Sequence, residues 1–282
     1  LHYPLRRQRQ MCIRDINKVI IAYLYTKFDI KENLINFINH YQKNSPGYDH
    51  ILVICYKLLE TSQVNLLRSI TKRVAHIEYI DPFRDNDFDF GSYKRIAEKY
   101  PNSPIFFTLG HSYPVSQNWL NKLMNHFDKK TLVGTSASYE SIFSSFLSKK
   151  KFKILFNFRK FFFIKKNFPN FPNPHMRTIN FMLYGSDYLE FISDKSFINK
   201  KDAWICESGF NSLTNYFKLK NYNIYVVNSD NDAFSIKDFK LSNTYCFSNQ
   251  SKQLFSDKHS RKYDAANDSD KIKISSTVWG LN

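Results

Sequence analysis

The sequence predicts an α/β protein built on a mostly parallel β-sheet with helices on both faces. Continuous apolar, β-branched runs such as KVIIAYLY (residues 18–25) and HILVICY (residues 50–56) are typical of strands buried on both sides. Segments with helical spacing separate such runs, and this alternation predicts crossover connections between parallel strands. A length of 282 residues with 43% hydrophobic content allows one large α/β domain, or two small ones, with a substantial core.

The expected elements follow one another closely along the chain. Apolar residues at positions 34, 35, 37, 38 and 41 predict a helix after the first strand. We expect further strands at 74–80, 105–108, 132–134, 179–183 and 223–228, and further helices at 64–70, 92–100, 119–127 and 208–219. Residues 264–275 are polar and are expected to form a mobile tail. Ligands of such sheets bind beyond the carboxyl ends of the strands, which here indicates residues 26–29, 81–91 and 109–112.

The first 15 residues are expected to lie outside the domain, which we assign to residues 16–282. They resemble the translated read-through of a sequencing adapter; a natural basic arm is the alternative. Their net charge is +3, so the formal net charge of +16 becomes +13 without them. A charge of this size indicates an anionic partner: a nucleotide, a lipid headgroup, a polyanionic glycan or a nucleic acid.

Several classes of protein are disfavoured by what the sequence lacks. It has no run of 18 apolar residues, no recognisable signal peptide, and no regular spacing among its four cysteines. These features predict a cytoplasmic protein without a disulfide framework or a zinc site. Walker, GxGxxG, HExxH and GxSxG motifs are absent, which removes the commonest ATPase, dehydrogenase, zincin and hydrolase interpretations.

An acidic run follows the expected third strand. Asp81, Asp85, Asp87 and Asp89 lie within DPFRDNDFDF, and carboxylates spaced in this way are potential ligands of a divalent cation that bridges phosphates. Asp89 or Ser92 is equally suited to cap the next helix. The run therefore predicts either a metal site or a helix start.

Three basic side chains are candidates for binding phosphate. His111 ends the fourth strand and is suited to a metal or a phosphate, with a packing role as the alternative. His175 and Arg177 lie between a proline-rich loop and an apolar strand. An imidazole and a guanidinium there would stabilise a diphosphate leaving group. A salt bridge within the loop is the alternative.

Two further segments carry polar side chains suited to a site. Glu207 lies in ESG at an expected helix start, where it would act as a general base or stabilise the helix N-terminus. Asp257 and His259 lie in DKHSRKY near the end of the chain. They would return to the site or belong to a solvated loop.

The segment 149–166 holds eight basic residues, no acidic residue and six phenylalanines. It is suited to an anionic membrane surface, where rings insert and each lysine contributes about 1 kcal/mol. The residues expected to face the membrane are Lys150, Lys151, Phe152, Phe156, Lys165 and Lys166. A core-facing helix with a solvated basic face is the alternative, and a nucleic-acid site is a third interpretation.

Together these segments resemble a bacterial family of GT-A-like glycosyltransferases from surface-polysaccharide loci (lipopolysaccharide, capsule or exopolysaccharide). The resemblance rests on DFGSY (89–93), Trp119-Leu120, HxRTxNFM (175–182), ESG with the following LT (207–214), residues 257–263 and Trp279-Gly280. It implies a Rossmann-type GT-A-like domain. It also implies that Glu207 lies where inverting enzymes place their base, and that His175, Arg177 and His259 lie near the donor phosphates.

We therefore expect a glycosyltransferase that moves a sugar from a nucleotide-sugar donor to a glycan or lipid-linked acceptor, with Glu207 as catalytic base. It would lie on the inner face of the cytoplasmic membrane. The expected donor-binding residues are Thr26, Asp89, Tyr93, His111, His175, Arg177 and His259, and the expected metal ligands are Asp87, Asp89 and Asp257. Dependence on Mn²⁺ or Mg²⁺ stays open, because the Asp-x-Asp motif usual after the fourth strand is missing.

Two other functions stay open from the sequence. One is a non-catalytic basic protein that binds membranes or glycans, and the other is a sugar-phosphate transferase. Nucleic-acid binding is disfavoured, because the sequence shows no recognised reading module.

Overall fold

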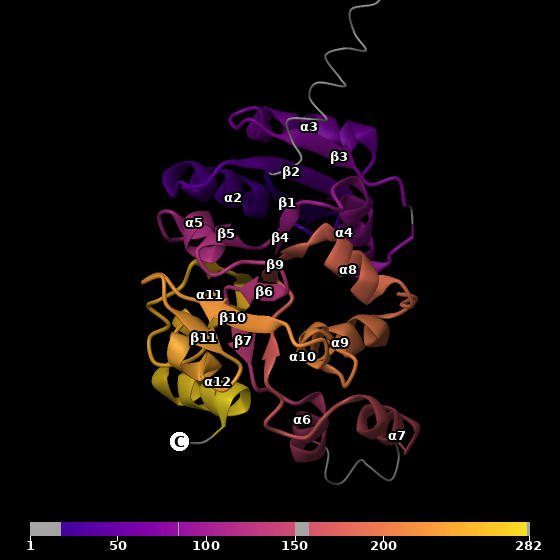
Figure 1. Cartoon of the computed structure of the whole chain (residues 1–282), viewed down its shortest axis with the longest axis vertical. Helices are drawn as coiled ribbons and strands as arrows, with labels where there is room; N and C mark the ends of the chain where they lie inside the picture. Colours follow the sequence, from indigo (N-terminus) through magenta and orange to yellow (C-terminus); the bar gives the residue numbers. More distant parts are fainter. Residues whose placement is uncertain (1–17, 84, 150–157, 281–282) are drawn as a thin grey trace, which may run out of the picture.

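The computed structural model describes residues 18–83, 85–149 and 158–280. Within these ranges, eight strands form one sheet in the order β11-β10-β6-β9-β4-β1-β2-β3 (Figure 1). All of these strands except β9 and β11 run in the same direction. The prediction of an α/β fold with a mixed, mostly parallel sheet is confirmed. The segment 1–15 lies outside the described residues.

The strands of the main sheet lie close to their predicted positions. They are β1 (Val19–Thr26), β2 (His50–Lys57), β3 (Ile77–Ile80), β4 (Pro104–Leu109), β6 (Thr131–Gly134), β9 (Asn180–Tyr184), β10 (Asn223–Val227) and β11 (Ala233–Ser235). Two short antiparallel pairs lie beside the sheet: β5 (Tyr113–Pro114) with β12 (Phe255–Ser256), and β7 (Ala137–Ser138) with β8 (His175–Met176).

The helices connect and cover these strands. They are α2 (Lys31–Lys43), α3 (Thr61–Thr71), α4 (Phe88–Lys99), α5 (Trp119–Met124), α6 (Ile142–Lys149), α7 (Phe158–Asn167), α8 (Gly185–Ile192), α9 (Lys200–Ser208), α10 (Leu213–Leu219), α11 (Lys258–Asp264) and α12 (Asp268–Trp279), with a 3₁₀ turn at Phe239–Ser242. Within the described residues, no helix is both long enough and apolar enough to cross a membrane.

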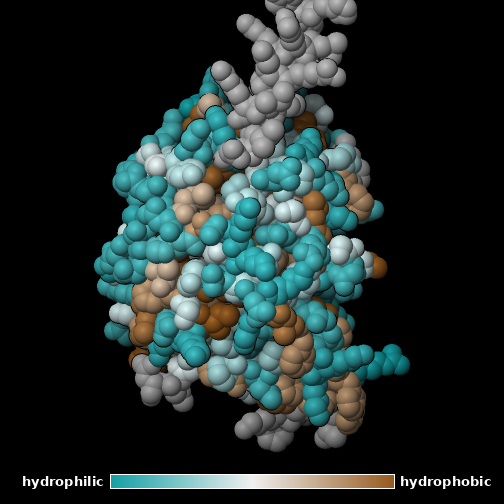
Figure 2. Space-filling model, in the orientation of Figure 1, coloured by the Kyte–Doolittle hydropathy of each residue, from teal (hydrophilic) through white to brown (hydrophobic). Residues whose placement is uncertain are grey.

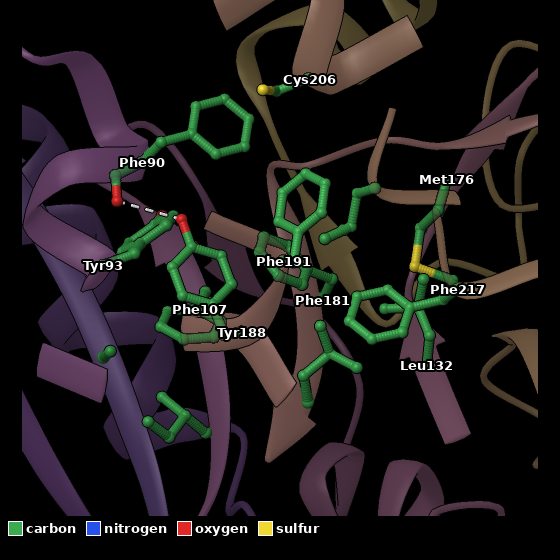
Figure 3. Packing of buried hydrophobic residues seen from close by; sticks show 14 of the residues in the cluster. Phe90, Tyr93, Phe107, Leu132, Met176, Phe181, Tyr188, Phe191, Cys206 and Phe217 are labelled. Carbon is green, nitrogen blue, oxygen red and sulfur yellow. Dashed lines mark hydrogen bonds between the residues drawn. The ribbon is translucent and has the colours of Figure 1, made fainter. Parts of the chain in front are cut away.

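The apolar run of β1 is continuous because the strand is buried on both sides. Ile20 and Ala22 belong to the core on the side of α4, α8 and α10, which also holds the aromatic cluster of Figure 3. Ile21 and Tyr23 belong to the core on the side of α2, α3 and α5, where Tyr23 stacks on Phe37 at 3.8 Å between ring centroids. Each of the two isoleucine side chains contributes about 1.5–3 kcal/mol by burial.

One predicted helix has a shifted start, and two sequence-based predictions of local structure are wrong. The predicted helix at 92–100 begins four residues earlier, as α4. The predicted helix at 208–219 is only α10, because Ser212 caps it through the Asn215 N–H; Glu207 instead lies in the last turn of the preceding α9. The tail predicted to be mobile forms α12, whose buried Trp279 donates from Nε1 to the Tyr245 carbonyl at 2.8 Å. Its apolar face is too short to be visible in a polar sequence.

Candidate functional site

A cavity of about 690 Å³ lies at the carboxyl ends of β1, β2 and β4, where a mostly parallel sheet is expected to bind its ligand. Thr26, Lys57 and Leu109 are at those strand ends. Residues from other segments, most of them later in the chain, close the rest of the wall. The predicted site residues that line this cavity are Thr26, Asp89, His111, His175, Arg177, Glu207 and His259.

Tyr93, Asp87 and Asp257 do not line the cavity. Tyr93, expected to bind the donor, lies in the aromatic core, with its ring centroid 4.6 Å from that of Phe107 and its hydroxyl buried (Figure 3). Its aromatic character is therefore explained by packing on the inner face of α4. The two carboxylates form ion pairs beside the cavity.

Asp87 belongs to a closed network of charges at the start of α4. Its carboxylate pairs with Lys57, which is almost fully buried, and accepts from Arg95 Nη1 at 2.7 Å. Arg95 also binds Asp81, whose carboxylate accepts from Ser92 Oγ at 2.5 Å. Burial opposes ionisation of Asp81, but the hydrogen bonds from Arg95 and Ser92 outweigh it and hold its pKa below the usual value.

Gly91 makes room for this network. A Cβ at residue 91 would lie 1.8 Å from the Asp87 carboxylate, so any other residue would displace that carboxylate from Lys57 and Arg95. The acidic run thus serves largely to neutralise two cations, the buried Lys57 and the half-buried Arg95.

Arg177 lies in a second closed pair. Its Nη1 donates to Asp257 Oδ2 at 2.6 Å, and its guanidinium lies 3.6 Å from the centroid of the Tyr245 ring. Burial opposes ionisation of Asp257, but the charge and hydrogen bonds of Arg177 hold its pKa well below the usual value. The Asp257 carboxylate also caps α11 by accepting from the His259 N–H at 2.7 Å. Arg177 therefore faces the cavity with its charge already balanced.

Glu207 and Asp89 are the open carboxylates of the site. No hydrogen bond or ion pair joins either side chain to another residue of the described ranges. Burial, followed by the negative charge of Asp89, raises the pKa of Glu207 to about 7. Burial also raises the pKa of Asp89 to about 6. A carboxylate with a pKa near 7 is matched to accepting a proton at neutral pH.

Two histidines of the cavity are held in the neutral form. His175 lies in the β7–β8 pair, and its Nδ1 hydrogen-bonds the Asn173 carbonyl at 2.8 Å, so Nδ1 carries the hydrogen and Nε2 offers a lone pair. Burial lowers the pKa of His175 to about 4. Burial likewise lowers the pKa of His111 to about 4, and its Nδ1 has no hydrogen-bond partner among the described residues. Both rings are therefore hydrogen-bonding groups rather than cations at neutral pH.

Among the described residues that line the cavity, the cations left for an anionic ligand are two lysines that the sequence did not single out. Lys200, at the start of α9, and Lys258, at the start of α11, both line the cavity with exposed side chains. No ion pair involves either of them in the described ranges. Lys258 lay inside a segment already marked as polar, whereas Lys200 sits in a helix start without any motif.

The acidic residues expected to bind a metal do not form a ready cage. Asp87 and Asp257 direct their oxygens at Lys57, Arg95 and Arg177. Within the described ranges, no group of three or more His, Cys, Asp or Glu side chains is placed to hold a metal ion. The residues present therefore do not fit a preformed Mn²⁺ or Mg²⁺ site.

No protein-family model and no curated protein matches the sequence. Among solved structures, 4-diphosphocytidyl-2C-methyl-D-erythritol synthase of Anaerococcus prevotii is 10% identical, covers 82% of this chain and 98% of its own, and has a TM-score of 0.45. Mouse xyloside xylosyltransferase 1 is 8% identical over 73% of this chain and 82% of its own, with a TM-score of 0.39.

A mannosyltransferase of Saccharomyces cerevisiae in complex with GDP is 10% identical and covers 67% of this chain, with a TM-score of 0.36. This chain spans 60% of the length of that mannosyltransferase. The similarity to glycosyltransferases and nucleotidyltransferases is thus distant and concerns the fold.

Proposed function

We propose that this protein is a glycosyltransferase that moves a sugar from a nucleotide-sugar donor to a hydroxyl of a glycan or lipid-linked acceptor in surface-polysaccharide synthesis. The observation that carries the proposal is the unpaired Glu207, whose pKa is raised to about 7 inside the main cavity. The resemblance of the HxRT and ESG segments to surface-polysaccharide glycosyltransferases supports the same function.

In the proposed reaction, Glu207 accepts the proton of the acceptor hydroxyl as that oxygen attacks the anomeric carbon of the donor sugar. The bond from the anomeric carbon to the phosphate oxygen breaks, and the nucleoside diphosphate leaves with the bonding electrons. The negative charge of Asp89 raises the proton affinity of Glu207. The neutral His175 can accept a hydrogen bond from a substrate hydroxyl at Nε2.

The diphosphate is proposed to lie between Lys258, His259 and Arg177. Lys258 supplies net positive charge, because it has no carboxylate partner in the described ranges. Arg177 supplies directional N–H donors from a pair that is neutral as a whole. Loss of Lys258 would therefore weaken donor binding more through charge, and loss of Arg177 more through geometry.

The observed ion pairs disfavour the sugar-phosphate transferase. That activity would need a metal cage in the acidic run, and Asp81 and Asp87 instead neutralise Arg95 and Lys57. A non-catalytic binding protein would not require an unpaired, desolvated Glu207, which is costly to keep without a chemical role.

The test is release of nucleoside diphosphate from a panel of nucleotide sugars, with and without a glycan acceptor. We expect turnover with one donor and a loss of about 10²–10⁴-fold in Glu207→Gln with donor binding retained. Glu140→Gln is the matched comparison, because Glu140 lines the same cavity. Undiminished turnover in Glu207→Gln, or a larger loss in Glu140→Gln, would remove the base assignment. Donors that neither react nor bind would favour the binding protein.

A further inference from the structure

Helices α6 and α7 stand at one end of the molecule, apart from the main sheet (Figure 1). Their facing sides form a small apolar cluster of their own around Phe146, Ile164 and Phe168. This cluster accounts for the apolar side chains of α7 that face α6. It does not account for the phenylalanines on the opposite, outward side of α7.

The outward side of α7 combines exposed rings with exposed positive charge. Phe158 and Phe162 are 51% and 60% exposed, lie one turn apart, and stack with ring centroids 6.4 Å apart. Figure 2 shows hydrophobic atoms beside hydrophilic ones at this end of the molecule. We call this side the α7 face; it consists of Phe158, Arg159, Phe162, Lys165 and Lys166, and all five side chains are exposed.

The charge of the surrounding sequence has one sign. Residues 141–167 contain no Asp or Glu. An isologous contact with a second copy of the chain would bring these positive faces together, which is unfavourable. The same charge attracts an anionic bilayer, where aromatic rings enter the boundary between headgroups and acyl chains.

The α7 face is connected to Glu207 through α9. Trp204 and Ile205 of α9 pack against the α6–α7 cluster, and the Phe210 N–H donates to the Asn167 carbonyl at the end of α7 at 2.9 Å. Motion of α7 relative to the end of α9 is thereby restricted.

A smaller cavity of about 350 Å³ extends from Glu207 towards α6. It shares Glu140, His175, Trp204 and Glu207 with the main cavity, and it ends at Ile142, the first residue of α6. Glu207 thus lines both cavities: the main cavity, where the donor is proposed to bind, and the smaller one, which leads towards α6.

We propose that the α7 face docks on an anionic lipid bilayer, and that an acceptor carried by a lipid of that bilayer reaches Glu207 through the smaller cavity. The second clause rests on the proposed glycosyltransferase activity, and the first does not. Four of the expected membrane-facing residues, Lys150, Lys151, Phe152 and Phe156, lie outside the described residues and are not needed for the proposal. The remaining two, Lys165 and Lys166, belong to the α7 face.

The test is flotation of the full chain with vesicles of phosphatidylcholine containing phosphatidylglycerol, compared with phosphatidylcholine alone. We expect binding only to the anionic vesicles, weakening as salt rises. Phe158→Ala with Phe162→Ala, and separately Lys165→Glu with Lys166→Glu, should each lower vesicle affinity at least about tenfold. The substituted side chains are exposed, so unchanged thermal melting serves to show that the variants fold.

Matched controls remove exposed apolar side chains, or reverse exposed lysines, elsewhere on the surface. Leu66→Ala with Leu219→Ala removes two side chains that are 74% and 83% exposed, and Lys129→Glu with Lys130→Glu reverses an adjacent exposed lysine pair. Both controls should float like the unchanged protein. Equal losses in controls and α7 variants, or no flotation at all, would overturn the proposal. So would binding of a single-stranded RNA probe, but not of vesicles, through the α7 lysines.

The docking and the chemistry fail separately in these experiments, because flotation needs neither donor nor acceptor. Flotation without diphosphate release from any donor would retain the docking and remove the transferase. If both hold, the α7 variants should keep transfer to a water-soluble acceptor and lose transfer to a lipid-linked one. Equal loss with both acceptors would contradict the role of the smaller cavity.

Discussion

Asp87 and Asp89 lie two residues apart at the start of α4, yet they belong to opposite kinds of environment. Asp87 is held by Lys57 and Arg95 in a closed network, whereas Asp89 faces the main cavity without a hydrogen bond to any described residue. The same contrast separates Asp257, held by Arg177, from the open Glu207. The ion-paired carboxylates neutralise cations of the protein. The unpaired ones are available for substrate; burial raises the pKa of both, and the charge of Asp89 further raises that of Glu207.

The largest expected effect is the loss of stability when an ion-paired carboxylate is removed. Asp257→Asn should lower the free energy of unfolding by about 4 kcal/mol, because it leaves the buried guanidinium of Arg177 without its counter-charge. Urea unfolding of the variant beside the unchanged protein measures the difference. A loss below about 1 kcal/mol would show that Arg177 is solvated or free to bind other groups.

The sharpest comparison substitutes the two neighbours of α4 in the same way. Asp87→Asn should cost about 3 kcal/mol, because buried Lys57 loses its carboxylate partner. Asp89→Asn should leave stability unchanged or raise it at pH 8, where the ionised carboxylate is desolvated and near Glu207. The free energies of unfolding of both variants at pH 8 test this. Equal losses of stability would contradict the distinction between the ion-paired and the unpaired carboxylate.

The next effect is on the pH dependence of the proposed transfer. Glu207 must be ionised to accept a proton, so kcat/KM should fall about tenfold per pH unit below a pKa of about 7. Asp89→Asn removes a negative charge that raises this pKa, and should move the acid limb down by roughly 1 unit. A pH–rate profile of each protein provides the measurement. An acid limb that stays in place would mean that another group supplies it.

The smallest expected effect is that of a divalent cation. Donor turnover should be the same in EDTA as in Mn²⁺, because Asp87 and Asp257 already accept from buried cations. Turnover that requires Mn²⁺ would contradict this. Asp89 and Glu207 would then be the first residues to test for metal affinity.

The pKa shifts of these carboxylates also predict how the stability of the fold depends on pH. The folded pKa values of Asp89 and Glu207 are raised above their unfolded values, so these groups favour the folded state as pH falls from about 7 towards 4. The folded pKa of Asp257 is depressed, so its contribution is present above the unfolded value and is lost as pH falls below about 4. The two kinds of carboxylate therefore act oppositely on acid stability.

The strands were predictable because burial on both sides imposes a continuous apolar pattern. The strands that contain Val19 and Leu52 could be predicted from their own residues, without knowledge of the segments that pack against them. Helices α9 and α12 were not predicted. The helix boundary marked by the single cap at Ser212 and the short buried face near Trp279 are weak signals in a polar sequence. Local pattern was informative where many residues shared one environment.

The sequence by itself determined the α/β class, the order of the strands along the chain and the segments that supply most of the cavity wall. It could not determine which charges meet, because pairing depends on distances between segments such as Arg177 and Asp257, 80 positions apart. Only the tertiary structure decided that Asp87 is ion-paired whereas Asp89 is not, and that Tyr93 belongs to the core. Hydrophobic pattern is a property of a segment, whereas a pKa and an ion pair are properties of what surrounds it.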